Sequence, residues 1–171
     1  MSWGRRRPKG SAPLSADEVE GRALAIVARR DHGIAELRRK LRDRGCAADH
    51  IDQTIERFVG LRYLDDDRVG RGYARSLVRG GWGPRGVRAK LGDRRFEREL
   101  IDTILLELDA EIDWAAQAAR RLRSKARARP EDPDERRAWR ERCWRQLARR
   151  GFSGGHAREA VRRLVESEEE E

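Results

Sequence analysis

The feature that most limits how this chain can fold is an internal repeat of its apolar pattern. Shifting the sequence by fifty residues, or by 106, places one set of five apolar positions on a second and a third set without gaps. The sets are Leu37, Leu41, Cys46, Ile51 and Ile55; Val87, Leu91, Phe96, Ile101 and Leu105; and Cys143, Leu147, Phe152, Ala157 and Val161. The helical spacing within each set predicts three tandem repeats of about fifty residues, each of three helices.

The composition agrees with small helical repeats. Only 37% of the residues are apolar and 42% are charged, which is a poor composition for one large core. A three-helix repeat has a small core and gains from its neighbours. We therefore predict an all-α protein of three tandem three-helix repeats forming an elongated, curved array. The repeats are expected at 15–64, 65–109 and 110–166, and Pro130 and Pro133 lengthen the connection between the first two helices of the third.

The segments outside the repeats have biased compositions. Residues 1–14 are basic and lack acids, and residues 167–171 are acidic, so we expect a disordered basic arm and an acidic tail. No apolar run approaches the ~20 residues that cross a bilayer, which predicts a cytoplasmic protein without membrane contact. Cys46 and Cys143 lack partners at metal-binding spacing and are interpreted as reduced, buried residues.

Several short motifs predict helix boundaries. Ser15 and Glu18 have the spacing of a capping box, and Gly45 is expected to end the helix that begins after Gly33. In "RGGWGPRG" the glycines at 80 and 81 should end one helix, and Pro84 should begin the next. Ser153 in "GFSGG" resembles a nucleophile loop, but its place in the repeat favours a helix N-cap.

Three consecutive aspartates, Asp65, Asp66 and Asp67, raise the question of a metal or acid–base site. They fall where the first repeat ends and the first helix of the second begins, a position where carboxylates accept hydrogen bonds from free backbone N–H groups. A metal site would need further ligands, and the three histidines form no HxH or HxxxH pair. We interpret the aspartates as helix caps and predict no metal, no cofactor and no catalytic residue.

Three stretches of the chain resemble the RecX family of bacterial RecA modulators. They are "ALAIVARRDHGIAELRRKLRDRG" (23–45), "YLDDDRVGRGYARSLVRGGWGPRGVRAKL" (63–91) and "RRGFS" (149–153), in the family's order and together spanning about residues 20–165. The chain departs from the family pattern at three places. Gly33 replaces a Ser, which should weaken a helix cap; Val69 and Gly70 replace Phe-Ala; and Arg95 replaces a turn glycine, with Asp93 shortening the approach to it.

The resemblance implies what the protein binds and does. A RecX protein is all-helical, binds RecA and lodges along the RecA–DNA filament, where it restrains strand exchange, ATP hydrolysis and assisted repressor cleavage. On this basis we expect a non-enzymatic regulator, acting as a monomer, with weak direct DNA binding. The net charge of +9 suits an anionic filament. The alternatives are a stand-alone nucleic-acid-binding protein with helix-turn-helix-like repeats and, less favoured, a metal-dependent nuclease built on the aspartates.

We hypothesise that the second helices of the three repeats share a basic, partner-binding face. The alternative for each residue is an ordinary solvated helix surface. Trp114, Trp139 and Trp144 are interpreted as core residues or, alternatively, as exposed anchors for a partner. The predicted basic face consists of Arg38, Arg39, Lys40, Arg42, Arg85, Arg88, Lys90, Arg145, Arg149 and Arg150.

Overall fold

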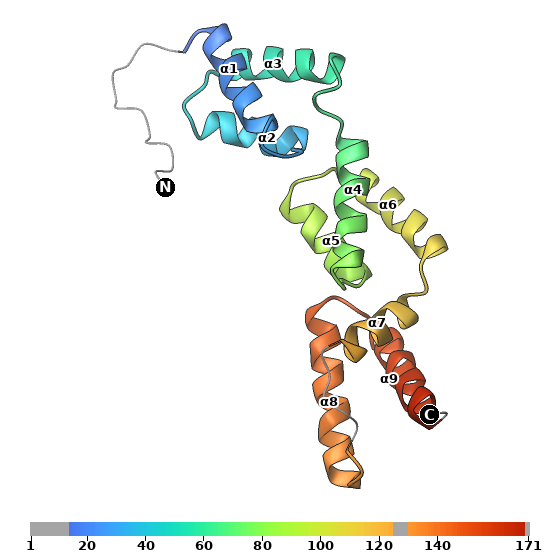
Figure 1. Ribbon diagram of the computed structural model, residues 1–171. Helices are drawn as coiled ribbons and strands as arrows, with labels where there is room; N and C mark the ends of the chain where they lie inside the picture. The colour runs from blue at the N-terminus through green and yellow to red at the C-terminus, as the bar shows by residue number, and fades with distance from the viewer. Residues whose placement is uncertain (1–13, 125–129, 170–171) are drawn as a thin grey trace. The chain divides into compact units, whose positions relative to one another are not determined.

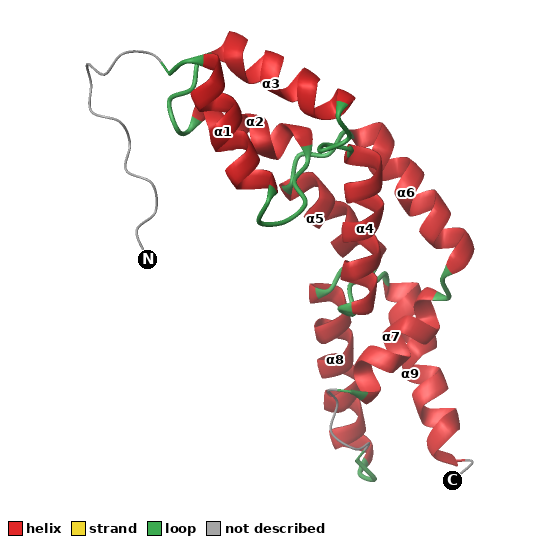
Figure 2. Cartoon of the chain, turned by 45° about the horizontal axis from the view of Figure 1, so that its top comes forward, coloured by secondary structure: helices red, strands yellow, loops and turns green. Residues whose placement is uncertain are grey.

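The computed structural model describes residues 14–124 and 130–169 of the chain, and these residues contain α-helices and no β-strand (Figures 1 and 2). Contacts divide the chain into two compact units. The first comprises the chain up to Arg71 together with Arg94–Glu97, and the second comprises Gly72–Asp93 together with Arg98–Glu171. The helices are α1 (Ala16–Val27), α2 (Ile34–Arg42), α3 (Ala48–Gly60), α4 (Asp66–Arg79), α5 (Pro84–Asp93), α6 (Arg98–Glu111), α7 (Trp114–Arg123), α8 (Pro133–Arg149) and α9 (Gly154–Glu169).

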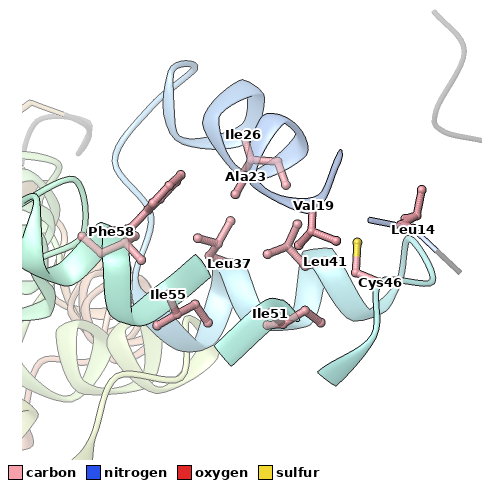
Figure 3. Packing of buried hydrophobic residues seen from close by; sticks show 11 residues of the cluster. Leu14, Val19, Ala23, Ile26, Leu37, Leu41, Cys46, Ile51, Ile55 and Phe58 are labelled. Atoms are coloured by element: carbon pink, nitrogen blue, oxygen red, sulfur yellow. The ribbon is translucent and has the colours of Figure 1, made fainter. Parts of the chain in front are cut away.

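The core of the first compact unit is made by α1, α2 and α3, which contact one another pairwise. Leu37 and Leu41 of α2 are fully buried and lie between Ile51 and Ile55 of α3 and the buried residues of α1 (Figure 3). Phe58 closes one end of this core and is also fully buried, with the Tyr63 ring packed edge-on against it at 5.4 Å. Burying such a side chain contributes roughly 2–3 kcal/mol, so three short helices can hold together around these few residues.

The predicted helix boundaries around the first repeat are confirmed. The Ser15 hydroxyl accepts a hydrogen bond from the Glu18 N–H at 3.3 Å, and the Glu18 carboxylate accepts one from the Ser15 N–H at 2.8 Å, which completes the capping box. Leu14, assigned by its composition to the basic arm, is instead 3% exposed and belongs to the core. The rest of that arm lies outside the described residues.

The repeat predicted from the apolar pattern is confirmed by burial. All fifteen residues of the three aligned sets are buried, including Cys46 and Cys143, whose thiols are free. The turn before the third helix is equivalent in every repeat as well. Gly45, Arg95 and Gly151, which align in the repeat, have φ angles of 75°, 63° and 81°. Arg95 therefore holds a left-handed conformation that favours glycine, at a cost of roughly 1 kcal/mol.

The third repeat follows the same plan, with a longer connection between α7 and α8. Asp113 caps α7 by accepting hydrogen bonds from the Ala115 and Ala116 N–H groups. Ser153 caps α9, as predicted, through a 3.1 Å hydrogen bond from the His156 N–H. Trp114 and Trp139 are buried in the core, whereas Trp144 remains 45% exposed. Helix α9 continues to Glu169 and so enters the predicted acidic tail, the last two residues of which lie outside the described part.

Candidate partner-binding surface

The three aspartates have three different structural partners. Asp65 caps α4, because its carboxylate accepts a 2.8 Å hydrogen bond from the Arg68 N–H. The Asp66 carboxylate accepts one at 2.7 Å from the N–H of Ile34, the first residue of α2. Asp67 forms an ion pair with Arg71, one turn along α4. The capping interpretation holds for Asp65, while Asp66 caps a helix that is remote in sequence.

The Asp66 contact explains how α2 tolerates glycine at its N-cap. Gly33 makes no side-chain capping bond of its own. A Cβ atom added to Gly33 would lie 3.1 Å from the Asp66 Oδ1 and 3.1 Å from the ring of Phe96. The Asp66 carboxylate therefore occupies the space that a capping serine side chain would fill, and it accepts the hydrogen bond in place of that serine. Burial raises the pKa of Asp66 above its usual value, with Glu97 adding to the effect and the Ile34 N–H opposing it.

A buried carboxylate lies next to this contact. Glu36 is 6% exposed and forms ion pairs with Arg30 and, at 3.2 Å, with Lys40; Arg94 from the turn between α5 and α6 lies 4.0 Å away. Burial alone would raise the pKa of Glu36, but the hydrogen bonds from Arg30 and Lys40 outweigh it and the pKa is lowered. The ion pairs of Glu36 with Arg30 and Arg94 connect the start of α2 to the segment after α1 and to the turn before α6.

His32 completes this cluster as a neutral side chain. Its Nδ1 lies 2.7 Å from the Arg30 carbonyl oxygen and must carry the proton, so Nε2 accepts from the Lys40 ammonium at 2.6 Å. Burial, more than any other cause, lowers the pKa of His32, and the nearby cations add to this. Lys40, whose side chain is 28% exposed, thus contacts two buried side chains of the first compact unit, those of His32 and Glu36.

The contacts between the start of α2 and the turn before α6 form a first junction. The second compact unit contains the equivalent junction of the repeat, between the start of α5 and the turn before α9, and it is made by different contacts. Phe152, which aligns with Phe96, packs against Gly83, which aligns with Gly33. The Gly83 N–H donates to the Arg150 carbonyl at 2.8 Å, and the Arg85 N–H donates to the Gly151 carbonyl at 3.1 Å. These backbone contacts hold the turn before α9 against the start of α5.

An aromatic ring replaces the buried carboxylate at this second junction. Trp82 aligns with His32, and the guanidinium of Arg150 lies over its ring at 4.6 Å, with the Lys90 ammonium at 5.3 Å. Gly86 takes the place of Glu36 because a Cβ atom there would lie 2.4 Å from the Arg150 carbonyl oxygen. The first junction is therefore held by ion pairs and the second by cation–π contacts.

The predicted basic residues fall into two groups. Helix geometry of about 100° per residue puts Arg38, Arg39 and Arg42 on one exposed stripe of α2, while Lys40 lies on the opposite flank. Half of the ten have partners within the chain. Arg38 pairs with Asp52 at 2.9 Å, Arg88 pairs with Asp102, which aligns with Asp52, and Lys40, Lys90 and Arg150 belong to the two junctions.

The other half extend into solvent. Among the residues that the structure describes, these five arginines have no ion-pair partner, and all are exposed. The first two are on α2, the third on α5 and the last two on α8: Arg39, Arg42, Arg85, Arg145 and Arg149.

Sequence reasoning missed several of the residues that form the junctions, among them Arg94. Arg44, Arg94 and Arg150 align in the three repeats, each just before the left-handed turn residue, and only Arg150 was predicted to be functional. In the first repeat, Arg44 donates instead to the Lys40 carbonyl at 2.9 Å. The shared register of these arginines was the available signal.

Two further classes of site are absent from the described part of the chain. It contains no cluster of three or more His, Cys, Asp or Glu side chains that could ligate a metal ion. None of its helices is both long enough and apolar enough to span a bilayer.

Comparison with known proteins identifies the family. Residues 21–58 match the first three-helix domain of RecX, and residues 65–105 match the second. The chain is 38% identical over 136 residues to the regulatory protein RecX of Pseudomonas entomophila, covering 79% of this chain and 84% of that protein. The chain belongs to the RecX family. The RecX protein of Xanthomonas campestris pv. campestris is 33% identical over 157 residues, covering 92% of this chain and 90% of the relative.

Solved RecX structures share the fold. The crystal structure of RecX from Lactobacillus salivarius matches with a TM-score of 0.75 at 16% identity, covering 88% of this chain and 96% of that one. A second crystal structure of a regulatory protein RecX has a TM-score of 0.67 at 20% identity, covering 82% and 70%. The all-α plan of tandem three-helix repeats and the assignment to RecX are therefore confirmed, and the relatives' name gives the chain a regulatory role.

Proposed function

We propose that the chain binds the RecA recombinase and the RecA–DNA filament and restrains its recombination, ATPase and coprotease activities without catalysing a reaction itself. We expect it to act as a monomer in the cytoplasm. Membership of the RecX family supports a regulatory role. The observation that carries the finer proposal is the group of five exposed arginines without partners on the second helices of the repeats. An arginine that has no carboxylate partner among the described residues is available to a carboxylate on another molecule, or to a phosphate.

The proposal assigns the other five predicted residues to the protein's own structure. Arg38 and Arg88 connect the second and third helices of their repeats through Asp52 and Asp102. Lys40 faces a buried glutamate. Reversing the charge of Lys40 would therefore damage the fold and give no information about binding.

Several weak contacts would make binding slow to reverse. Arg39 and Arg42 belong to the first compact unit, and Arg85, Arg145 and Arg149 to the second. When one compact unit is bound, the other is held at a high effective concentration near the filament. A regulator bound in this way would restrain subunits that must move or dissociate during strand exchange.

The test is a charge reversal limited to free arginines. Arg39→Glu/Arg42→Glu should lower the inhibition of DNA-dependent RecA ATPase about tenfold or more, because two contacts are lost and two repulsions are added. Arg29→Glu/Arg57→Glu changes the net charge equally at exposed residues outside α2 and serves as the control. Equal inhibition by the two variants, with circular dichroism showing intact helices, would refute the proposed surface.

A salt titration distinguishes a filament regulator from a stand-alone nucleic-acid-binding protein. A phosphate binder loses affinity steeply with salt and needs no protein partner. We expect weak binding to single-stranded DNA alone and much tighter binding to RecA-coated DNA with a non-hydrolysable nucleotide. Equal affinity for bare and coated DNA would favour the alternative.

A further inference from the structure

The third repeat has an open hollow between its second and third helices, α8 and α9. These helices contact each other and are roughly antiparallel, joined by a short turn (Figure 1). The hollow has a volume of about 460 Å³. Arg140 and Trp144 line it from α8, one turn apart, and α9 contributes Arg158, Val161, Arg162, Val165 and Glu166.

The register of the repeats shows what is unusual about this hollow. In the first repeat the Arg38–Asp52 ion pair joins the second and third helices, and in the second repeat Arg88–Asp102 does the same. The same two positions in the third repeat are occupied by Trp144 and Arg158. A tryptophan and an arginine cannot form that ion pair, so the third repeat lacks the bridge that spans the helices in the other two.

The lining of the hollow combines an apolar surface with unpaired positive charge. Trp144 is 45% exposed, although a tryptophan favours burial, and Val161 and Val165 lie across from it on α9. Arg140 and Arg158 are exposed and have no partner among the described residues. Arg162, in contrast, is neutralised by Glu159 and Glu166.

We propose that this hollow is a docking site for an acidic segment of a partner protein, which inserts an apolar side chain against Trp144 and places carboxylates on Arg140 and Arg158. Exposed tryptophan flanked by arginine is the composition of energetically dominant interface residues. Peptide helices and strands anchor in apolar grooves of this kind. The inference goes beyond the proposed function, because none of the residues that line the hollow is among its five exposed arginines, and it holds or fails whichever protein is regulated.

A polynucleotide fits the hollow less well than an acidic peptide. Its aliphatic lining from Val161 and Val165 provides no hydrogen bond for a base. The Glu166 carboxylate also lines the hollow and would face the closely spaced phosphates of a nucleic acid strand. Carboxylates spaced along a peptide can contact the two free arginines and avoid this glutamate.

The test uses the full chain and three fluorescent probes. The first is a peptide in which glutamate and aspartate alternate with leucine and phenylalanine, the second has the same acids with glycine in place of the apolar residues, and the third is oligo(dT). Trp144→Arg/Arg158→Asp places in the third repeat the pair found in the other two. Leu106→Arg/Arg98→Asp replaces an exposed apolar residue and an exposed arginine of α6 by the same two residues and is the control.

We expect the first peptide to bind the wild type and the control variant equally and the Trp144→Arg/Arg158→Asp variant at least about tenfold more weakly by fluorescence anisotropy. The indole N–H resonance of Trp144, assigned with Trp144→Phe, should shift on titration. The proposal would be overturned if the glycine peptide bound as tightly as the first peptide, or if oligo(dT) bound at Trp144 in preference to the peptide. It would also be overturned if the Trp144→Arg/Arg158→Asp variant bound the first peptide as tightly as the wild type, or if the first peptide did not bind up to about 1 mM.

Discussion

Replacing Glu36 by glutamine should remove the charge on which the first junction depends. The carboxylate is 6% exposed, and the replacement leaves Arg30 and Lys40 without their counter-charge. Breaking a fully buried ion pair costs about 3–5 kcal/mol. The Arg30 and Lys40 side chains are 44% and 28% exposed, so water screens part of this loss. We expect the free energy of unfolding to fall by about 2 kcal/mol at neutral pH, which is about 30-fold in the unfolding equilibrium.

The same cluster should make the first compact unit sensitive to acid in two stages. The pKa of His32 is lowered from 6.5, so its contribution to stability is complete above that pH and is lost as the pH falls and the ring must accept a proton. The pKa of Glu36 is lowered from 4.5, so its contribution is lost at lower pH, as the carboxylate becomes protonated. Glu36→Gln should abolish the second stage and keep the first.

Amide hydrogen exchange across α1, α2 and α3, measured as a function of pH, reports these changes where they arise. Glu56→Gln is the matched control, because Glu56 is exposed on α3 and has no partner among the described residues. The reasoning would be refuted if Glu36→Gln stayed within about 0.5 kcal/mol of the wild type, or if its acid sensitivity below the range of His32 were unchanged.

Three further pairs of substitutions should change the stability measured by urea unfolding. Asp66→Ala should lower stability by about 1 kcal/mol, because a helix N–H loses its acceptor. Asp66→Asn should lower stability less, because its amide oxygen can still accept this hydrogen bond and it carries no buried charge. The raised pKa of Asp66 means that the aspartate becomes less stabilising as the pH rises above 3.8. Gly86→Ala should cost more than about 2 kcal/mol, since its Cβ would lie 2.4 Å from a carbonyl oxygen, while Gly92→Ala, with no atom within 4 Å, should gain up to about 1 kcal/mol. Arg95→Gly should stabilise by about 0.5 kcal/mol, and Gly45→Arg should destabilise by about 1 kcal/mol, because both positions have positive φ.

The sequence predicted the parts of the fold that depend on periodicity. Apolar residues such as Leu37 and Leu41 recur at helical spacing, and this spacing is a direct consequence of the face that each helix buries. The caps at Ser15, Asp65 and Ser153 were also predictable, because a cap bonds to N–H groups only two or three residues away.

Contacts between segments distant in sequence were not predictable in the same way. Nothing local to Asp66 indicates that it accepts a hydrogen bond from Ile34. Lys40 and Arg39 are adjacent and both basic, yet Lys40 faces a buried glutamate and Arg39 faces solvent. The spacing of Glu36 and Lys40, one turn apart on α2, is visible in the sequence, but the burial of Glu36 beside Arg94 depends on packing between distant segments.

The turn that precedes the third helix of a repeat has a fixed length, and this limits where the chain can grow. Leu91 and Phe96 are separated by the same interval as Leu147 and Phe152, and each phenylalanine reaches back to a glycine at the start of an earlier helix. The connection between the first and second helices receives this contact at its last residue, Gly33 in one case and Gly83 in the other, and it differs in length from repeat to repeat. Tags, labels or additional loops inserted between α7 and α8 should therefore leave folding intact, while one extra residue between α8 and α9 would pull Phe152 out of its place.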